Sequence, residues 1–490
     1  MLSRQSLRSC LRPFLTLALL RSRFDARSVP LAAAALSIVM VTLAAGCALR
    51  PPYEEPEVRP AAVRNADQAT FASTPYDPAW WKEFDDPVLA ELLTAALNAN
   101  LDVRAAVARL DQARAVFDDV KRDQYPTVTV GAAVDRRQQA VPGLTDEPVT
   151  TTTYRAGFDA FWEIDLFGRI RSAVSAASAN AQSFDAAIDD VRVSVAAEAA
   201  RNYFELRGIQ QQIGVAELSL ANARETQRLS QVRRDAGIGE EQDVASARAR
   251  VAAVESGLPP LRAALAERRH RLAVLTGVRP GELAINLDPR SYPTLAKALP
   301  LGDPTALLRR RPDVRVAERR LAAATAQEGV AAADLFPRVT VSGVLGFLAG
   351  RGSLFATSDS RNWAITPSLT WAAFDLGSAR ARLRGTEAVT RETLANYEQT
   401  VLRALEETEN ALVNYRENQQ RLVSLVDQAR ESGRAASIAR VRYKEGLADF
   451  LQLLDAERTE LQAQEAVAQA EAGVFTGVVG IYKSLGGIPR

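Results

Sequence analysis

One stretch of this sequence is too long and too regular for the core of an ordinary globular domain. Residues 169–235 contain no proline, and Gly208 and Gly214 are their only glycines. A helix rises 1.5 Å per residue, so this stretch would form a helix about 100 Å long. Such a helix must pack side by side with other long helices to cover its apolar stripe. The Gly237-Ile238-Gly239 turn and a second helical pattern, from about 242 to 276, predict an antiparallel helical hairpin.

The residues just before this helical stretch alternate between apolar and polar side chains. Successive side chains of a strand point to opposite faces, so residues 154–164 are predicted to form a strand with one apolar face. An alternating segment at 127–134 predicts its partner, joined to it through a polar loop over 138–153. The apolar face carries Tyr154, Ala156, Phe158, Ala160, Trp162 and Ile164, and the other carries Arg155, Gly157, Asp159 and Glu163.

Prolines set further expectations about where elements end or bend. A helical pattern from about Leu89 to Gln124 should stop at Pro126, because proline cannot continue the hydrogen-bond ladder. Pro259 and Pro260 should kink or divide the returning helix of the hairpin. Pro367, in a later strand pattern, should mark a bulge or local irregularity.

The second half of the chain repeats the first. Leu101–Arg104 matches Pro312–Arg315, and Tyr125-Pro126 matches Phe336-Pro337, both with an offset of 211 residues. A constant offset over this length predicts a duplicated unit of helix, two-stranded hairpin, very long helix, tip and return helix. The predicted boundaries are 86–280 for repeat 1 (hairpin 127–166, tip 236–241), 281–303 for a linker, and 304–490 for repeat 2 (hairpin 338–376, tip 445–450).

Four strands of this kind are too few to form a membrane pore alone. A sheet in lipid must close, because unpaired strand edges are too costly there, and membrane barrels begin at about eight strands. Three chains would supply twelve strands, and their long helices could continue the barrel as a helical tube. The predicted fold is therefore an α+β membrane protein: a trimeric 12-stranded β-barrel, four strands per chain, continued by a long α-helical barrel. A soluble sheet packed on a core is the alternative for the strands alone.

The N-terminus has the pattern of an export signal. Six arginines precede an apolar run that ends in Leu-Ala-Ala-Gly-Cys, and this order is typical of a secretory signal. The Ala-Gly-Cys end resembles the lipobox of bacterial lipoproteins, although its usual leucine is displaced to Leu43. This resemblance predicts a signal peptide over 1–46, a diacylglycerol and an N-acyl chain on Cys47, and a tether over 47–85. The alternative is an ordinary signal peptide with an incidental cysteine.

Composition excludes several classes of function. The chain has a formal net charge of +1, and the residues before Cys47 carry an excess of positive charge. The rest of the chain has no such excess, so its charge gives no support to nucleic-acid binding. Cys10 and Cys47 are the only cysteines and His270 is the only histidine, so a histidine-based triad or a Cys/His metal site is not expected. The sequence has no phosphate loop of the G-x-x-x-x-G-K-[ST] type. We expect no enzyme activity, no catalytic residue, no metal and no cofactor apart from the lipid.

Six motifs together resemble the outer-membrane efflux protein family, specifically its NodT-type lipoprotein branch. They read W-W-K-E-F-D-D-P at 80–87, F-W-E-I-D-L-F-G-R-I-R at 161–171, A-R-N-Y-F-E-L-R-G at 200–208, R-R-P-D-V-R-V-A-E-R-R-L at 310–321, F-D-L-G at 374–377 and Y-K-S-L-G-G at 482–487. The resemblance implies a homotrimeric outer-membrane channel with its α-barrel in the periplasm. It also implies two partners, a periplasmic adaptor (membrane fusion protein) and an inner-membrane pump of the resistance-nodulation-division (RND) type.

The same resemblance places adaptor contacts and a gate at the two helix tips. The tips comprise Gly237, Ile238 and Gly239 in repeat 1, and Gly446, Leu447 and Ala448 in repeat 2. In the family the closed tip is tied by side-chain bonds, and Asp243 and Tyr443 match one such pair. Asp455 matches a constriction carboxylate on the helix after the second tip.

One other class of function accounts for part of the sequence. A lipid-anchored periplasmic coiled-coil adaptor or scaffold would explain the helices and Cys47, but not the paired amphipathic hairpins. An enzyme, for instance a hydrolase with paired carboxylates, has no convergent set of residues in its favour.

Overall fold

The computed structural model describes residues 53–56, 63–66, 70–72, 74, 79–141, 145–293, 298–302 and 311–486. The predicted signal peptide 1–46 and the lipidation site Cys47 lie outside these residues. The chain divides into two units, which are described separately. A sheet unit contains residues 129–169 and 336–371, and a helical unit contains 52–128, 170–335 and 372–490.

The sheet unit contains a four-stranded sheet in the order β2-β3-β5-β6. Its strands are β2 (Thr127–Val141), β3 (Thr145–Ile164), β5 (Arg338–Ala349) and β6 (Arg361–Thr370). β5 pairs antiparallel with both β3 and β6. The apolar face is not packed on a core: Trp363 is 72% exposed, and Val130, Phe158, Ile365 and Leu369 are also exposed. This argues against the soluble-sheet alternative.

Two expectations about the strands are wrong. The loop predicted over 138–153 is largely strand, because β2 continues to Val141 and β3 begins at Thr145. Backbone hydrogen bonds extend the pairing where the side chains no longer alternate. Pro367 causes no bulge, since it pairs with Val341 in an unbroken register. β6 is an outermost strand of the sheet, where a proline can direct its missing N–H away from the ladder.

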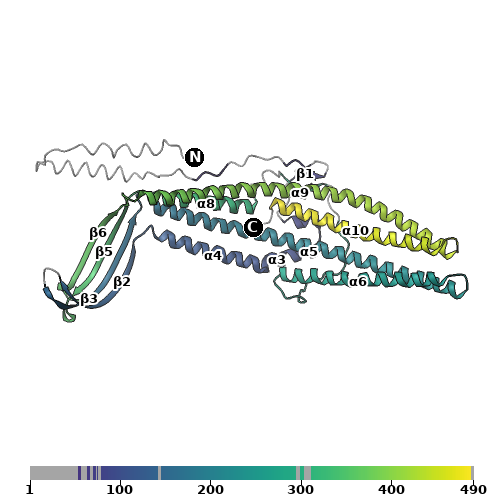
Figure 1. Cartoon of the computed structure of the whole chain (residues 1–490), viewed down its shortest axis with the longest axis horizontal. Helices are drawn as coiled ribbons and strands as arrows, with labels where there is room; N and C mark the ends of the chain where they lie inside the picture. Colours follow the sequence, from purple (N-terminus) through teal and green to yellow (C-terminus); the bar gives the residue numbers. More distant parts are fainter. Residues whose placement is uncertain are drawn as a thin grey trace. The chain divides into compact units, whose positions relative to one another are not determined.

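The helical unit is dominated by two long antiparallel hairpins. α5 (Arg169–Asp235) and α6 (Glu241–Leu275) form one, and α9 (Leu376–Lys444) and α10 (Phe450–Leu485) form the other. Figure 1 shows their turns at the same end of this unit. α5 covers the residues predicted from the proline-free stretch, about 100 Å of helix. None of the helices in the described part of the chain has a stretch both long and apolar enough to span a membrane.

One further expectation about helices is wrong, and of the two outcomes expected at Pro259 and Pro260, a kink or a division, the division does not occur. The single helix predicted over 89–124 is two helices, α3 (Pro87–Ala99) and α4 (Leu101–Arg122). Asn100 separates them because its side chain caps α4, accepting from the backbone N–H of Asp102 at 2.8 Å and of Val103 at 3.2 Å. α6 is not divided, since it runs through both Pro259 and Pro260. The helix that stands before β5, as α4 stands before β2, is α8 (Pro312–Ala333).

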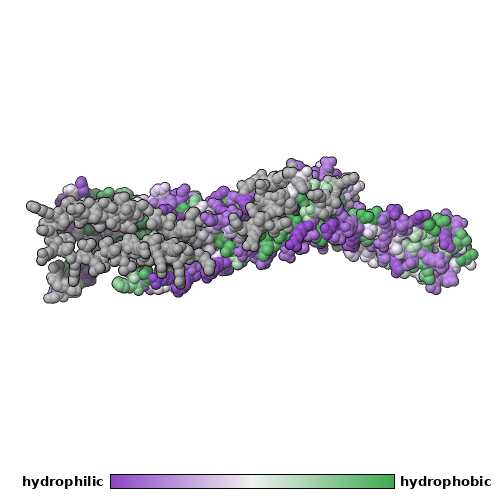
Figure 2. Space-filling model, turned by 90° about the horizontal axis from the view of Figure 1, so that it is seen from above, coloured by the Kyte–Doolittle hydropathy of each residue, from purple (hydrophilic) through white to green (hydrophobic). Residues whose placement is uncertain are grey.

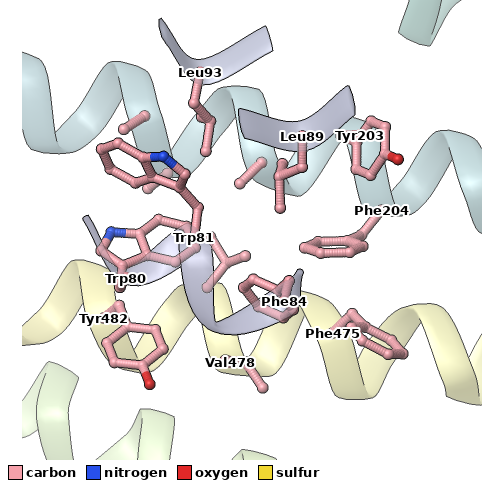
Figure 3. Packing of buried hydrophobic residues seen from close by; sticks show 14 of the residues in the cluster. Trp80, Trp81, Phe84, Leu89, Leu93, Tyr203, Phe204, Phe475, Val478 and Tyr482 are labelled. Carbon is pink, nitrogen blue, oxygen red and sulfur yellow. The ribbon is translucent and has the colours of Figure 1, made fainter. Parts of the chain in front are cut away.

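An aromatic core ties the start of the chain to these helices (Figure 3). A short 3-10 helix, η2 (Trp80–Phe84), buries Trp80 against Tyr482 of α10, with ring centroids 5.3 Å apart. Phe84 contacts Phe204 of α5 at 5.0 Å. Part of the predicted tether is thus packed in a core, and a parallel pair of two-residue strands, β1 (Phe71–Ala72) and β4 (Leu299–Pro300), joins it to the predicted linker.

Candidate gate at the helix tips

The two hairpin turns close with the same backbone geometry. In the first, Gly237 has φ +75°, and the N–H of Ile238 donates to the carbonyl of Arg233 at 3.0 Å. In the second, Gly446 has φ +74°, and the N–H of Leu447 donates to the carbonyl of Arg442 at 2.7 Å. This is the helix-ending motif that glycine permits, because a side chain is strained at positive φ. The turns fall within the ranges expected from the sequence.

Each tip presents an apolar side chain to solvent. Ile238 is 67% exposed and Leu447 is 69% exposed. Gly239 and Ala448 are partly covered. Figure 2 shows hydrophobic residues at this end of the helices, beside hydrophilic ones. Exposed apolar groups at two adjacent turns suit a protein contact, and the adaptor contact stays a prediction.

Tyr443 is buried between the hairpins. Its hydroxyl lies 3.1 Å from the hydroxyl of Ser230 on α5, and its ring meets Phe450 edge-on at 5.8 Å. Ala247 of α6 and Leu453 of α10 complete this cluster. All four long helices therefore meet around Tyr443, which ties the two tips together.

Asp243 lies at the same tips but is not bonded to Tyr443. It is half-buried in the first turn of α6. Among the described residues no hydrogen bond joins the expected pair, because the Tyr443 hydroxyl is turned toward Ser230. Burial raises the pKa of the Asp243 carboxyl above its ordinary value, and the negative charge of Glu240 adds to the effect, while Arg233 opposes it.

Arg233 is the tip residue that the sequence did not single out. Its guanidinium lies 5.1 Å from the centre of the Tyr443 ring, and its Nη1 donates to the Tyr443 carbonyl at 3.2 Å. It stands in the last turn of α5, where a helix favours positive charge. This position in the last turn of α5, four residues before Gly237, is the feature of the sequence that could have identified Arg233 as a tip residue. Arg233, and not Asp243, thus contacts Tyr443 and joins α5 to α9.

Asp455 lies on an exposed side of α10. Its side chain is 67% exposed, and its Oδ1 accepts a hydrogen bond from Arg458 at 2.7 Å. An exposed pair of this kind contributes little to stability. The nearby buried carboxylate is Glu457, which faces the other helices instead. Asp455 is therefore free to face a pore or a second chain, and its gate role stays a prediction.

No catalytic or metal chemistry emerges from these contacts. Across the described ranges no three acidic, histidine or cysteine side chains are grouped so as to hold a metal ion. His270 is exposed on α6. The polar groups of the tips join helices to one another, as Ser230 and Arg233 of α5 do with Tyr443 of α9. Such contacts suit a gate made of helices.

Comparison with known proteins identifies the family. The family model described as Outer membrane efflux protein matches residues 92–278 and 304–487. The Pyoverdine export outer membrane protein OpmQ of Pseudomonas putida is 32% identical, over 88% of this chain and 92% of its own length. The Toluene efflux pump outer membrane protein TtgC of Pseudomonas putida is 30% identical, over 90% and 93%.

A solved structure agrees with these relatives. The outer-membrane channel OprN is 48% identical and superposes with a TM-score of 0.88, covering 90% of this chain and 99% of OprN. This relationship rules out the coiled-coil adaptor and the hydrolase. The chain belongs to the outer membrane efflux protein family and is a transport protein rather than an enzyme.

Proposed function

We propose that this chain is the outer-membrane exit duct of a tripartite efflux system. It passes small molecules passively, after an inner-membrane pump of the RND type has delivered them through a periplasmic adaptor. Its relatives named as outer membrane proteins of efflux pumps support this assignment. The two helical hairpins would form the periplasmic α-barrel, and their tips would contact the adaptor and open as the gate.

The observation that carries the proposal is the open four-stranded sheet. Its apolar side chains are exposed, and β2 and β6 are its outermost strands. In lipid, both edges need partners. A homotrimer would supply them by joining β6 of one copy to β2 of the next, in a barrel of twelve strands. The recurrence of helix, two strands, long helix and return helix in each half of the chain supports the two-repeat organisation.

The gate would be built from the tip residues already described. Tyr443, with Arg233 between the hairpins, would hold the tips together, Asp243 would loosen them when it is ionised, and Asp455 would face the constriction. Cys47 would carry the lipid that anchors the chain in the outer membrane. Similarity to relatives does not identify the transported compound, because two relatives of nearly equal sequence identity to this chain are named for pyoverdine export and for toluene efflux.

Reconstitution tests the proposal directly. The full-length protein is extracted in detergent, its mobility is compared with and without heating, and it is inserted into planar lipid bilayers. We expect an oligomer that converts to a monomer on heating, together with single-channel conductance. Extraction as a monomer with no conductance would overturn the exit-duct proposal.

A further inference from the structure

A buried carboxylate lies between the two helical hairpins, away from the tip turns. Glu457 of α10 is only 5% exposed. Its Oε1 accepts one hydrogen bond from the Thr226 hydroxyl of α5 at 3.2 Å and another from Nε of Arg440 of α9 at 2.9 Å. Thr226 is thus the partner on the opposite hairpin, whereas Arg440 belongs to the same hairpin as Glu457. Arg440 also bonds Glu460, which keeps it in place.

A second guanidinium faces the same carboxylate without bonding to it. Arg250 of α6 lines a cavity of about 20 Å³ together with Arg440, Glu457 and Glu460. Its Nη2 is buried and has no hydrogen-bond partner within the part of the chain that the structure describes. Burial lowers the pKa of Arg250, and the charges of Glu457 and Glu465 oppose that effect. The α5–α6 hairpin therefore offers Glu457 one bonded hydroxyl and one unbonded cation.

A buried guanidinium nitrogen without a hydrogen-bond partner costs free energy, and an arrangement that gives Nη2 of Arg250 a partner regains it. Packed helix interfaces tend to have discrete arrangements rather than a continuum, so a small shift can exchange one partner for another. A shift of one hairpin against the other breaks the bond between Thr226 and Glu457, since that bond crosses between them. The bond between Arg440 and Glu457 moves with its own hairpin and survives.

We propose that Glu457 is the exchange point of a two-position latch: it bonds Thr226 in the present arrangement, and Arg250 after the α9–α10 hairpin has shifted against the α5–α6 hairpin. The inference rests on the proposed channel function, to which it adds specific gating residues. Thr226 then stabilises one arrangement and Arg250 stabilises the other. A merely structural cluster would instead make both residues stabilise the same arrangement.

Two single variants distinguish the latch from a merely structural cluster, by the direction in which each variant shifts the open probability of the channel. Thr226→Val removes the hydroxyl while keeping the shape, and Arg250→Gln removes the cation. Hydrogen bonds to charged groups are strong enough that each loss should shift the open-to-closed ratio about tenfold. The two shifts should be in opposite directions when single-channel open probability is measured in planar bilayers. The sign for Thr226→Val identifies which arrangement conducts.

The controls keep the test independent of folding and of the channel proposal. Arg248→Gln alters an exposed arginine of α6, bonded to Gln231 of the same hairpin at 3.0 Å, and should leave open probability unchanged. Arg250→Lys should restore most of the wild-type value. If the wild type conducts but the two variants shift open probability in the same direction, or either leaves it unchanged, the latch is overturned. If the wild type itself does not conduct, it is the exit-duct proposal that fails.

Discussion

At the scale of single residues, the contacts between the two hairpins depend on a few polar side chains, although the long helices carry many residues of the same types. The sequence identified Tyr443 and Asp243 by resemblance to the family, but not Arg233 or Glu457. Arginine and glutamate are abundant along the long helices, and periodicity alone does not decide which of them is buried. Only the packing of four helices around one point selects Glu457 over the exposed Asp455 two residues earlier.

Asp243 gives a pH-dependent prediction. Its pKa is raised by burial and by Glu240, so the folded tip binds the proton more tightly than an opened tip does. The stability of the tip should therefore fall as pH rises through the ordinary aspartate pKa toward the raised value. Asp243→Asn should slow hydrogen exchange of the tip amides a few-fold at pH 7, relative to wild type at the same pH. The difference should vanish in acid, and a difference that grew in acid would contradict this account.

Asp455 gives a prediction about the constriction. If three copies of this carboxylate face the pore, Asp455→Ala removes a ring of charge that narrows and orders it. We expect higher single-channel conductance and a several-fold gain in susceptibility to large antibiotics. Asp427→Ala is the matched control, because Asp427 forms an equally exposed pair with Arg430 at 3.0 Å. Unchanged conductance and susceptibility for Asp455→Ala would remove this residue from the gate.

At the scale of elements, sequence periodicity located the long helices and their turns well. α5 covers the predicted range, because a proline-free stretch with strong helix formers has few alternatives. The strands were less predictable: β3 has 20 residues, and much of its first half lacks alternation. Strand length there is determined by pairing with a neighbour, which a single segment of sequence does not encode.

The close approach of β3 and β5 gives a prediction about the sheet. Gly157 stands opposite Gly346, and a Cβ on Gly157 would lie 2.6 Å from the carbonyl oxygen of Leu345. Gly157→Ala should therefore cost about 1–3 kcal/mol through overpacking and lower the yield of assembled protein. Gly343→Ala is the control, since its Cβ would meet its nearest neighbour at an ordinary 3.7 Å. Equal yields of heat-modifiable protein for both variants would show that the sheet tolerates the contact.

At the scale of the whole molecule, the family predicted from the sequence is confirmed, whereas the duplication and the trimeric assembly stay predictions. The predicted duplication rests on pairs of matching motifs that share an offset of 211 residues. The sequence predicts a tether over residues 47–85 and does not predict the aromatic core around Trp80. Their described part includes buried Trp80, Trp81 and Phe84, which pack only once α5 and α10 are brought together.

The lipid anchor is a whole-molecule prediction that a mass measurement tests. Cys47→Ser should remove the diacylglycerol and the N-acyl chain, and the mature protein should lose the corresponding mass. We expect the channel still to reach the membrane and to conduct, because the exposed apolar face of the sheet does not depend on the anchor. Equal masses for the variant and the wild type would refute lipidation at this cysteine.

The position of β2 and β6 at opposite edges of the sheet has a consequence for mixed populations of subunits. In the proposed ring every contact is head-to-tail, so each copy pairs its β2 edge with one neighbouring copy and its β6 edge with the other. A copy with a blocked β2 edge would still offer an intact β6 edge to a normal copy, and the ring could not close. Such a subunit should be dominant-negative when co-expressed with the wild type. The loss of channel activity should rise more steeply than the fraction of variant subunits.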